Sequence, residues 1–238
     1  MASSDQTPGP MPPGDGSVPP GKPMGTGKSV LDKSASMMQS LKPVNQISQH
    51  ACTFAAYSHD MSRQIVTHHY LSRVNDEFLQ CAVYDSDEQN ARLIGVEYIV
   101  SDKVFDTLSP EEQKLWHSHA DEIKSGMWVN PRVPEMLSKL QDIAQSYGKF
   151  WCTWQTDRGD RLPLGAPALM MSPDKVKSEL VTERDGKYNI STDGLKESRE
   201  KIELAKPVDP HADVWKNKGK GFAIDIQSVE MKRTAPLP

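Results

Sequence analysis

Gly-Val-Glu-Tyr-Ile-Val, residues 95–100, interleaves β-branched and aromatic side chains with polar ones. The same pattern covers residues 93–100 as a whole and appears earlier over residues 69–84. Because neighbouring side chains of a strand point to opposite faces of a sheet, the interleaving predicts strands with one buried face. These strands favour a sheet protein in which other elements cover the buried face.

Helical patterns follow these strands and predict the covering layer. Ser109-Pro110-Glu111-Glu112 supplies an N-cap, a proline at the first helical position and a glutamate at the third. We therefore expect a helix from there to about Lys124, before Gly126. Residues 134–147 repeat a helical apolar period that ends at Gly148 and predict a second helix.

The remaining segments complete the expected domain. Phe-Trp-Cys-Thr-Trp-Gln, residues 150–155, resembles a strand, residues 173–206 are expected to be helical in parts, and residues 221–231 are expected to form one last strand. The first 28 residues hold seven of the 18 prolines and six of the 15 glycines, without a hydrophobic period. We expect residues 1–28 to be a disordered tail and residues 29–234 to form a single α+β domain, with a mixed or antiparallel sheet covered by helices.

One amphipathic helix is predicted directly after the tail. Its apolar side chains recur at the spacing of one helix face until Pro43 ends the helix, and they are Val30, Leu31, Met37, Met38 and Leu41. Docking of this face on the domain is the favoured interpretation, and contact with a lipid surface is the alternative. The few lysines nearby predict only modest attraction to anionic headgroups.

Charge, cysteine content and hydropathy argue against several classes of protein. The net charge is −4, and the only compact basic cluster is Lys216, Lys218 and Lys220, so nucleic-acid binding is not expected. Three widely spaced cysteines indicate neither a disulfide framework nor a structural zinc site, and they fit a reducing compartment. No apolar run approaches the roughly 18 residues that span a bilayer, so we expect membrane contact to be peripheral.

Six of the seven histidines lie between residues 50 and 119, and two of them fall in Trp-His-Ser-His, residues 116–119. On the expected helix, His117 and His119 would point about 200° apart and could not both bind one metal ion. His68 and His69 would point to opposite faces of a strand.

One member of that second pair could still meet His119. The candidate metal ligands are His68 or His69, His119 and Glu122, with Glu97 as a further candidate, and these ligand types suit zinc or iron. Hydrogen-bonded structural histidines are the favoured alternative.

No motif in the chain assigns a reaction. The chain has no Gly-x-Ser-x-Gly elbow, no His-Glu-x-x-His, no phosphate loop and no dinucleotide fingerprint. Cys81 could act as a nucleophile with His68 or His69, but its position in Leu-Gln-Cys-Ala-Val-Tyr indicates a half-buried strand thiol. We assign no catalytic residues and do not favour an enzyme.

Six segments, taken together, resemble the oil body-associated protein family of plants. They are Gln-His-Ala-Cys-Thr-Phe-Ala-Ala-Tyr-Ser-His-Asp-Met (49–61), Thr-His-His-Tyr (67–70), Gln-Cys-Ala-Val-Tyr-Asp (80–85), Gly-Val-Glu-Tyr-Ile-Val-Ser (95–101), Trp-His-Ser-His (116–119) and Thr-Trp-Gln-Thr-Asp (153–157). The resemblance is close over about residues 41–173 and does not reach the tail. It implies residence on the surface of seed lipid droplets and a contribution to droplet integrity, with no catalytic residues to carry over.

We therefore expect a non-enzymatic protein of the lipid droplet surface and the cytoplasm, without a transmembrane segment. Its expected partners are the droplet surface or droplet-coat proteins. Attachment is expected through the amphipathic helix, with the loop Gly126-Met127-Trp128-Val129 as a second candidate and a coat protein as a third. No cofactor is expected, and the alternative is a metal-binding protein or enzyme that holds zinc or iron at a His/Glu site.

Overall fold

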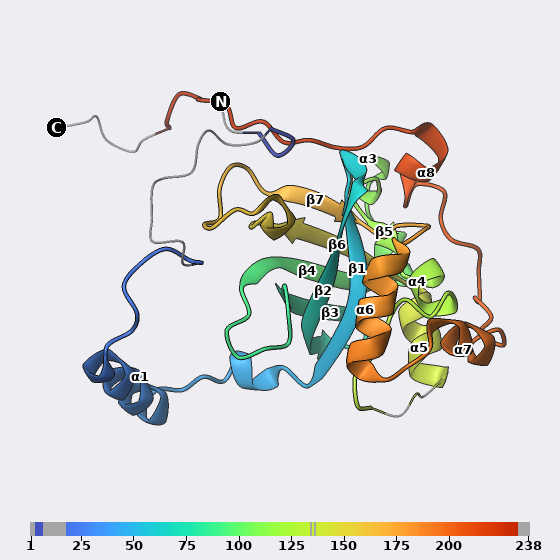
Figure 1. The fold of residues 1–238 in the computed structure, drawn as a ribbon. Coiled ribbons are helices and arrows are strands. Elements are labelled where there is room, and N and C mark those ends of the chain that lie inside the picture. The colour runs from blue at the N-terminus through green and yellow to red at the C-terminus, as the bar shows by residue number, and fades with distance from the viewer. Residues whose placement is uncertain (1–2, 7–17, 134, 136, 233–238) are drawn as a thin grey trace.

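A closed antiparallel sheet forms the centre of the computed structural model, which describes residues 3–6, 18–133, 135 and 137–232 (Figure 1). Its strands are β1 Gln49–Tyr57, β2 Asp60–Asn75, β3 Phe78–Tyr84, β4 Leu93–Ser101, β6 Ser146–Cys152 and β7 Ala168–Met171. They pair in the order β1-β2-β3-β4-β6-β7, and β7 pairs with β1, so the six strands form a barrel. The expected single domain with an antiparallel sheet and helices is confirmed, and closure of the sheet is an addition to that expectation.

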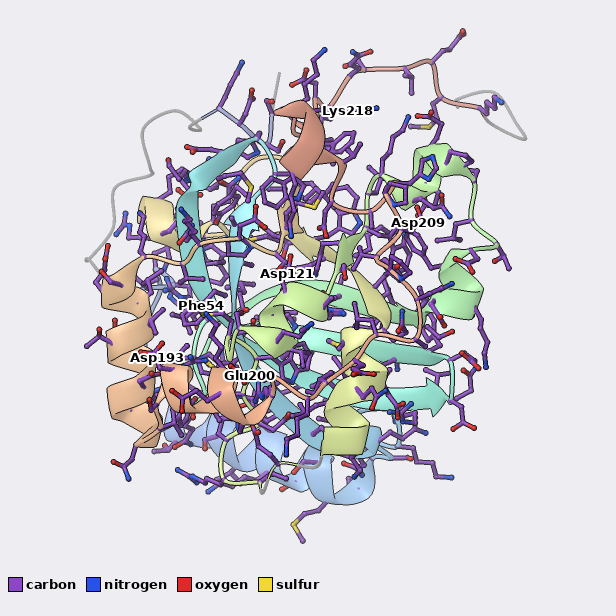
Figure 2. All side chains as sticks on the ribbon, turned by 90° about the vertical axis from the view of Figure 1, so that its right-hand side faces the viewer. Phe54, Asp121, Asp193, Glu200, Asp209 and Lys218 are labelled. Carbon is purple, nitrogen blue, oxygen red and sulfur yellow. The ribbon has the colours of Figure 1, made fainter. Side chains whose placement is uncertain are left out.

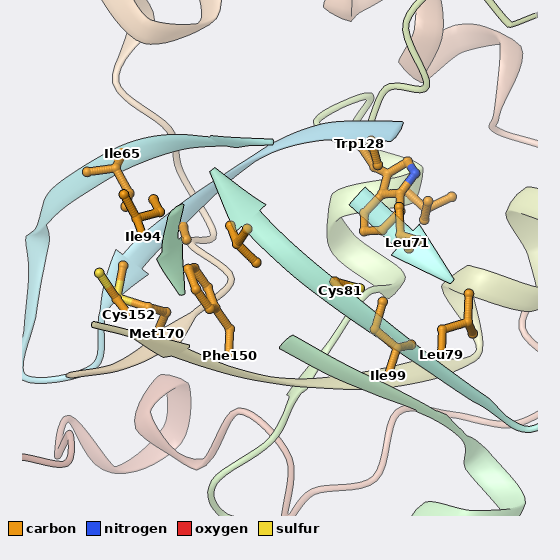
Figure 3. Close-up of a cluster of buried hydrophobic side chains, with 14 of the residues drawn as sticks. Ile65, Leu71, Leu79, Cys81, Ile94, Ile99, Trp128, Phe150, Cys152 and Met170 are labelled. Atoms are coloured by element: carbon orange, nitrogen blue, oxygen red, sulfur yellow. The ribbon is translucent and has the colours of Figure 1, made fainter. Parts of the chain in front are cut away.

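The interior of the closed sheet holds the main hydrophobic core, part of which Figure 3 shows. On β3 the burial alternates strictly, so that Leu79, Cys81 and Val83 point inward. Phe150 of β6 and Trp128, from a loop outside the sheet, belong to the same core. Trp128 is only 2% exposed, so the loop expected as a second lipid anchor has its tryptophan in the core instead.

Strand β4 buries a charged residue that its hydrophobic pattern alone would not place inside. Glu97 and Ile99 are buried, whereas Val96 and Tyr98 are each 39% exposed. Gly95 lies on the inner face next to Phe150, where an added Cβ would come closer than 3.0 Å to the phenyl ring. The strand therefore brings a carboxylate into the interior of the closed sheet.

Further helices lie beside the closed sheet, most of them on one side of it (Figure 1). They are α2 Asp102–Phe105, α3 Pro110–Gln113, α4 Ala120–Lys124, α5 Leu137–Ala144, α6 Ser178–Tyr188, α7 Thr192–Ser198 and α8 Val214–Lys218, with 3-10 turns η1 Val44–Gln46 and η2 Thr156–Arg158. Figure 2 views the side on which α4, α7 and α8 lie, where Asp121, Asp193 and Lys218 are labelled. The Arg184 guanidinium of α6 lies 4.9 Å from the centre of the Phe54 ring of β1, and this contact covers the second face of that strand.

The prediction of one helix from Ser109 to about Lys124 is wrong, because the observed helix is much shorter. Ser109 does cap α3 by accepting a hydrogen bond from the Glu112 N–H, but α3 ends at Gln113. The chain then forms a two-residue strand, β5 His117–Ser118, which pairs with β6, before α4 begins. Hydrogen bonding to a distant strand has overridden a locally favourable helix pattern.

Two other elements differ from those expected from the sequence. The helix expected over residues 134–147 is α5, which ends at Ala144 because β6 begins at Ser146. The strand expected over residues 221–231 is absent from the described residues apart from an isolated bridge between Ser3 and Asp225. Residues 1–2 and 7–17 lie outside the described residues, so disorder of residues 1–28 and the bounds of the domain stay predictions.

The amphipathic helix α1, Thr26–Met38, lies apart from the closed sheet (Figure 1). None of its residues is buried, so the favoured docking on the domain is not observed. The helix ends earlier than expected, and Leu41 lies beyond it. Within the part of the chain that is described, no helix has the length and apolarity that crossing a membrane requires.

Candidate functional site

Glu97 is the centre of a cluster of imidazoles inside the closed sheet. The carboxylate is 1% exposed, and His69 of β2 places Nδ1 2.8 Å from its Oε2. His117 Nε2 and His119 Nε2 lie 3.1 and 3.6 Å from Oε1. Two segments that are distant in sequence, β2 and residues 117–119, thus direct three ring nitrogens at one buried carboxylate.

Strand β5 explains why His117 and His119 share this target. Residues two apart in extended chain point to the same face of a sheet. The pairing of His117 with Gly148 and the backbone bond from the His119 N–H to the Ser146 carbonyl hold both residues along β6. The expectation that these two histidines could not face one ion was wrong, because it rested on a helix that does not form there.

Gly148 leaves the space that the two histidines need. A Cβ at this position would come closer than 3.0 Å to Glu97 Oε1, His117 Nε2 and His119 Cε1 at once. Real Cβ atoms do not approach other atoms so closely, so these buried side chains would have to move to admit one. The absence of a side chain on β6 is therefore a condition for the cluster.

Hydroxyl groups hold two of the imidazole rings. His119 Nδ1 lies 3.0 Å from Ser146 Oγ, and that hydroxyl donates to the Ile143 carbonyl at 2.7 Å. His69 Nε2 lies 2.8 Å from Thr67 Oγ1. The rings are thus held from the side opposite to Glu97.

Several polar atoms of this cluster lack a hydrogen bond. Among the described residues, His69 Nδ1, Glu97 Oε2, His117 Nδ1 and His119 Nε2 are buried without a partner of suitable geometry. His69 Nδ1 and Glu97 Oε2 face each other closely, but the contact lacks hydrogen-bond alignment. Buried polar groups are normally satisfied, so such a concentration of unpaired atoms is unusual.

A small cavity adjoins these atoms. Its free space of about 10 Å³ is enough for about one water molecule or ion. The four clustered residues line it together with Glu122, Trp128 and Phe150. Glu122 accepts a hydrogen bond from Thr53 Oγ1 at 3.1 Å and so contributes a second carboxylate to the cavity wall.

The charges in the cluster shift the pKa values of its members. Burial alone would raise the pKa of Glu97, but the nearby His69 and the contacts from His117 and His119 outweigh it and hold that pKa well below its usual range. Burial would lower the pKa of His117, yet the adjacent Glu97 carboxylate reverses the direction and raises it. Glu97 and His117 thus each favour the charged form of the other.

The residues proposed from sequence fall into two places. His69, His119 and Glu97 come together, and Glu122 lines the same cavity. His68 points to the other face of β2, where its Nδ1 lies 3.0 Å from His50 Nε2 and 3.4 Å from the Tyr188 hydroxyl.

His117 was not among the candidates. A His-x-His pair on a strand would have indicated it, but the helix pattern concealed that signal. Its ring completes the cluster at Glu97.

The buried thiols lead to a prediction about chemical reactivity. Burial raises the pKa of Cys52 to about 12 and that of Cys152 to about 11, and Cys81, 4% exposed, has its pKa raised well above the usual range. At pH 8 the thiolate fraction is small, so we expect Ellman's reagent to label the native chain at least about a hundredfold more slowly than the unfolded chain. Rapid labelling of one thiol per native chain would contradict the buried arrangement and return Cys81 to consideration as a nucleophile.

Comparisons with known proteins agree on one family. A family model described as "Protein of unknown function (DUF1264)" matches residues 41–203. Oil body-associated protein 2B of Zea mays is 53% identical and oil body-associated protein 2A of Arabidopsis thaliana is 56% identical, each over the full length of both chains. Oil body-associated protein 1B of Arabidopsis thaliana is 42% identical over 91% of each chain. No solved structure matches this one.

Proposed function

This chain belongs to the oil body-associated protein family, and from that premise we propose that it is a non-enzymatic protein of the lipid droplet surface that helps to maintain droplet structure. The names of its relatives support the association with oil bodies, which are lipid droplets of seeds. A pool in the cytoplasm is part of the proposal and is compatible with three free cysteines.

The observation that carries the mode of attachment is the exposed apolar face of α1. Met37 and Met38 are 87% and 84% exposed, and Val30 and Leu31 lie on the same side of the helix with 62% and 69% exposure. Ser34 falls within this face, but its hydroxyl donates to the Val30 carbonyl at 2.9 Å and so is satisfied by the helix itself. A face of this kind gains free energy when a lipid surface covers it.

Burial of apolar area, rather than charge, would supply most of this affinity. Full burial of one Leu or Met side chain is worth about 1.5–3 kcal/mol, whereas a lysine near an anionic membrane contributes about 1 kcal/mol. Only Lys28 and Lys33 are basic within α1, and Asp32 offsets one of them. We therefore expect attachment to depend weakly on salt and on anionic lipid.

The test compares two double variants of the full-length chain. Leu31→Asp with Met37→Asp places two charges on the apolar face, and Ser29→Asp with Ser36→Asp places the same two charges on the polar face of the same helix. We expect the first variant to lose at least about tenfold in binding to artificial triacylglycerol droplets coated with phospholipid, measured by flotation, because charged groups cannot enter the lipid interface without a large cost. The second variant should float with the droplets as the wild-type chain does.

Both variants should keep the circular dichroism and thermal unfolding of the wild-type domain, because α1 has no buried residue. Equal flotation of the two variants would rule out attachment through α1. A wild-type chain that binds isolated seed droplets but not protein-free droplets would contradict direct attachment and point to a coat protein as the receptor.

A further inference from the structure

We propose that Glu97, His117 and His119 bind one divalent transition-metal ion, zinc or ferrous iron, in the cavity inside the closed sheet. The proposal rests on the geometry of the buried cluster and is independent of the attachment to lipid droplets.

The three ligand atoms are already gathered. A carboxylate oxygen of Glu97 and one ring nitrogen from each histidine lie within 4.8 Å of one another, and all three side chains are buried. Two imidazoles and one carboxylate form a ligand set that both zinc and non-haem iron use, with a further position left for water. The space beside them, about 10 Å³, suits a single ion far better than an organic ligand.

The hydrogen bonds of His119 assign its tautomer. The Ser146 hydroxyl donates its only proton to the Ile143 carbonyl, so toward His119 Nδ1 it can only accept. Nδ1 therefore carries the proton, and in the neutral ring Nε2 presents a lone pair to Glu97 Oε1 at 3.6 Å. Two acceptor atoms that face each other without a proton between them form an arrangement that a cation satisfies, and an N–H bond on the far side of the ring is the usual support of a metal-binding histidine.

His69 lies beside the other oxygen of the carboxylate in this arrangement. Its Nδ1 is 2.8 Å from Oε2, the carboxylate oxygen that the other two histidines leave free, and its Nε2 is held by Thr67. His69 is therefore not one of the three proposed ligands. Cys81 lies with His69 and Glu97 in a second group of ligand atoms, and it does not belong to the group that Glu97 forms with His117 and His119.

The charge balance also favours a cation. Glu97 and Glu122 both line the cavity, and neither a lysine nor an arginine is among the described residues of its wall. A buried carboxylate without a positive partner is strongly unfavourable. One divalent ion in the cavity would supply the positive charge that lysine or arginine does not supply there.

The first experiment measures metal by mass spectrometry on the full-length chain without a histidine tag. The chain is purified without chelator, loaded with Zn²⁺ or, without oxygen, with Fe²⁺, and dialysed. We expect about one bound ion per wild-type chain. The variants His119→Gln and Glu97→Gln each remove a ligand at nearly constant volume, and the amount of metal that they bind should fall at least about tenfold. His211→Gln is the matched control, because His211 is exposed and its imidazole pairs with Asp209, outside the buried cluster. It should bind as the wild type does.

A second measurement does not depend on the variants remaining folded. Wild-type chain loaded with Co²⁺ should show ligand-field bands in the visible region and no thiolate charge-transfer band, because all three ligands are nitrogen or oxygen. A thiolate band would make Cys81 a ligand and overturn the proposed set. Wild-type chain that holds no ion after loading, or His119→Gln and Glu97→Gln variants that hold as much as the wild type, would overturn the site itself.

Discussion

The Arg199→Met variant is expected to lose about 3–5 kcal/mol of its free energy of unfolding, measured by urea denaturation. Arg199 is 0% exposed and donates from Nη1 to the carbonyls of Ile123 and Trp128, each at 2.9 Å, while it pairs with Glu135. Methionine fills much of the volume but provides no donor. The Trp128 carbonyl would then be left without a partner in the protein interior, and the Ile123 carbonyl would keep only backbone donors such as the Gly126 N–H. An unpaired buried carbonyl is more costly than the loss of an exposed hydrogen bond.

Lys201→Met is the matched control for this prediction. Lys201 is exposed and lies two residues away, so its replacement should change the free energy of unfolding by no more than about 0.5 kcal/mol. The effect of Arg199→Met should also reach the cavity, because Trp128 lies against the His119 ring with centroids 5.5 Å apart. Equal denaturation midpoints for the two variants would show that the buried arginine contributes little to stability.

Gly148→Ala should destabilise the chain by about 3 kcal/mol and remove its metal binding, although it adds only one methyl group. The new Cβ would enter the space between Glu97, His117 and His119, and relief would require β5 to separate from β6 or the carboxylate to turn away. Either movement separates the ligand atoms. Urea denaturation and metal content measured on the same preparation test both parts of the prediction.

Gly186→Ala tests the same substitution in open space and should have the opposite sign. Gly186 lies within α6, and nothing lies within 4 Å of the position where its Cβ would be. Alanine in a helix is favoured over glycine by roughly 0.5–1 kcal/mol, so this variant should be slightly more stable than the wild type. If Gly148→Ala were tolerated as well as Gly186→Ala, the close packing at Glu97 would be disproved.

The sequence predicted those elements whose signals lie within a few residues. Ser109 caps α3, and burial alternates along β3, as the local sequence patterns predict. The amphipathic face of α1 was also recognisable, because helical spacing fixes which side chains share a side. Whether that face is covered depends on the rest of the domain, and the favoured docking therefore failed.

The inward direction of Glu97, in the interior of the closed sheet, could not be predicted from a local pattern. Alternation along residues 95–100 shows that the strand has two faces, but it does not say which of them is buried, and hydropathy would have chosen Val96 and Tyr98. Glu97 can face inward only because His69, His117 and His119 supply its partners, and these come from strands β2 and β5 and the start of α4. Partners so far apart in the chain leave no periodic signal around the glutamate.

The amino-acid sequence by itself thus determined the family, the antiparallel sheet with helices and the amphipathic helix α1. Only the tertiary structure decided that β6 would pair with residues 117–118 and convert an expected helix into a strand, so that two histidines share one target. The physical reason is that helix propensity acts within one turn, whereas β pairing and the burial of a charge depend on residues far away in sequence.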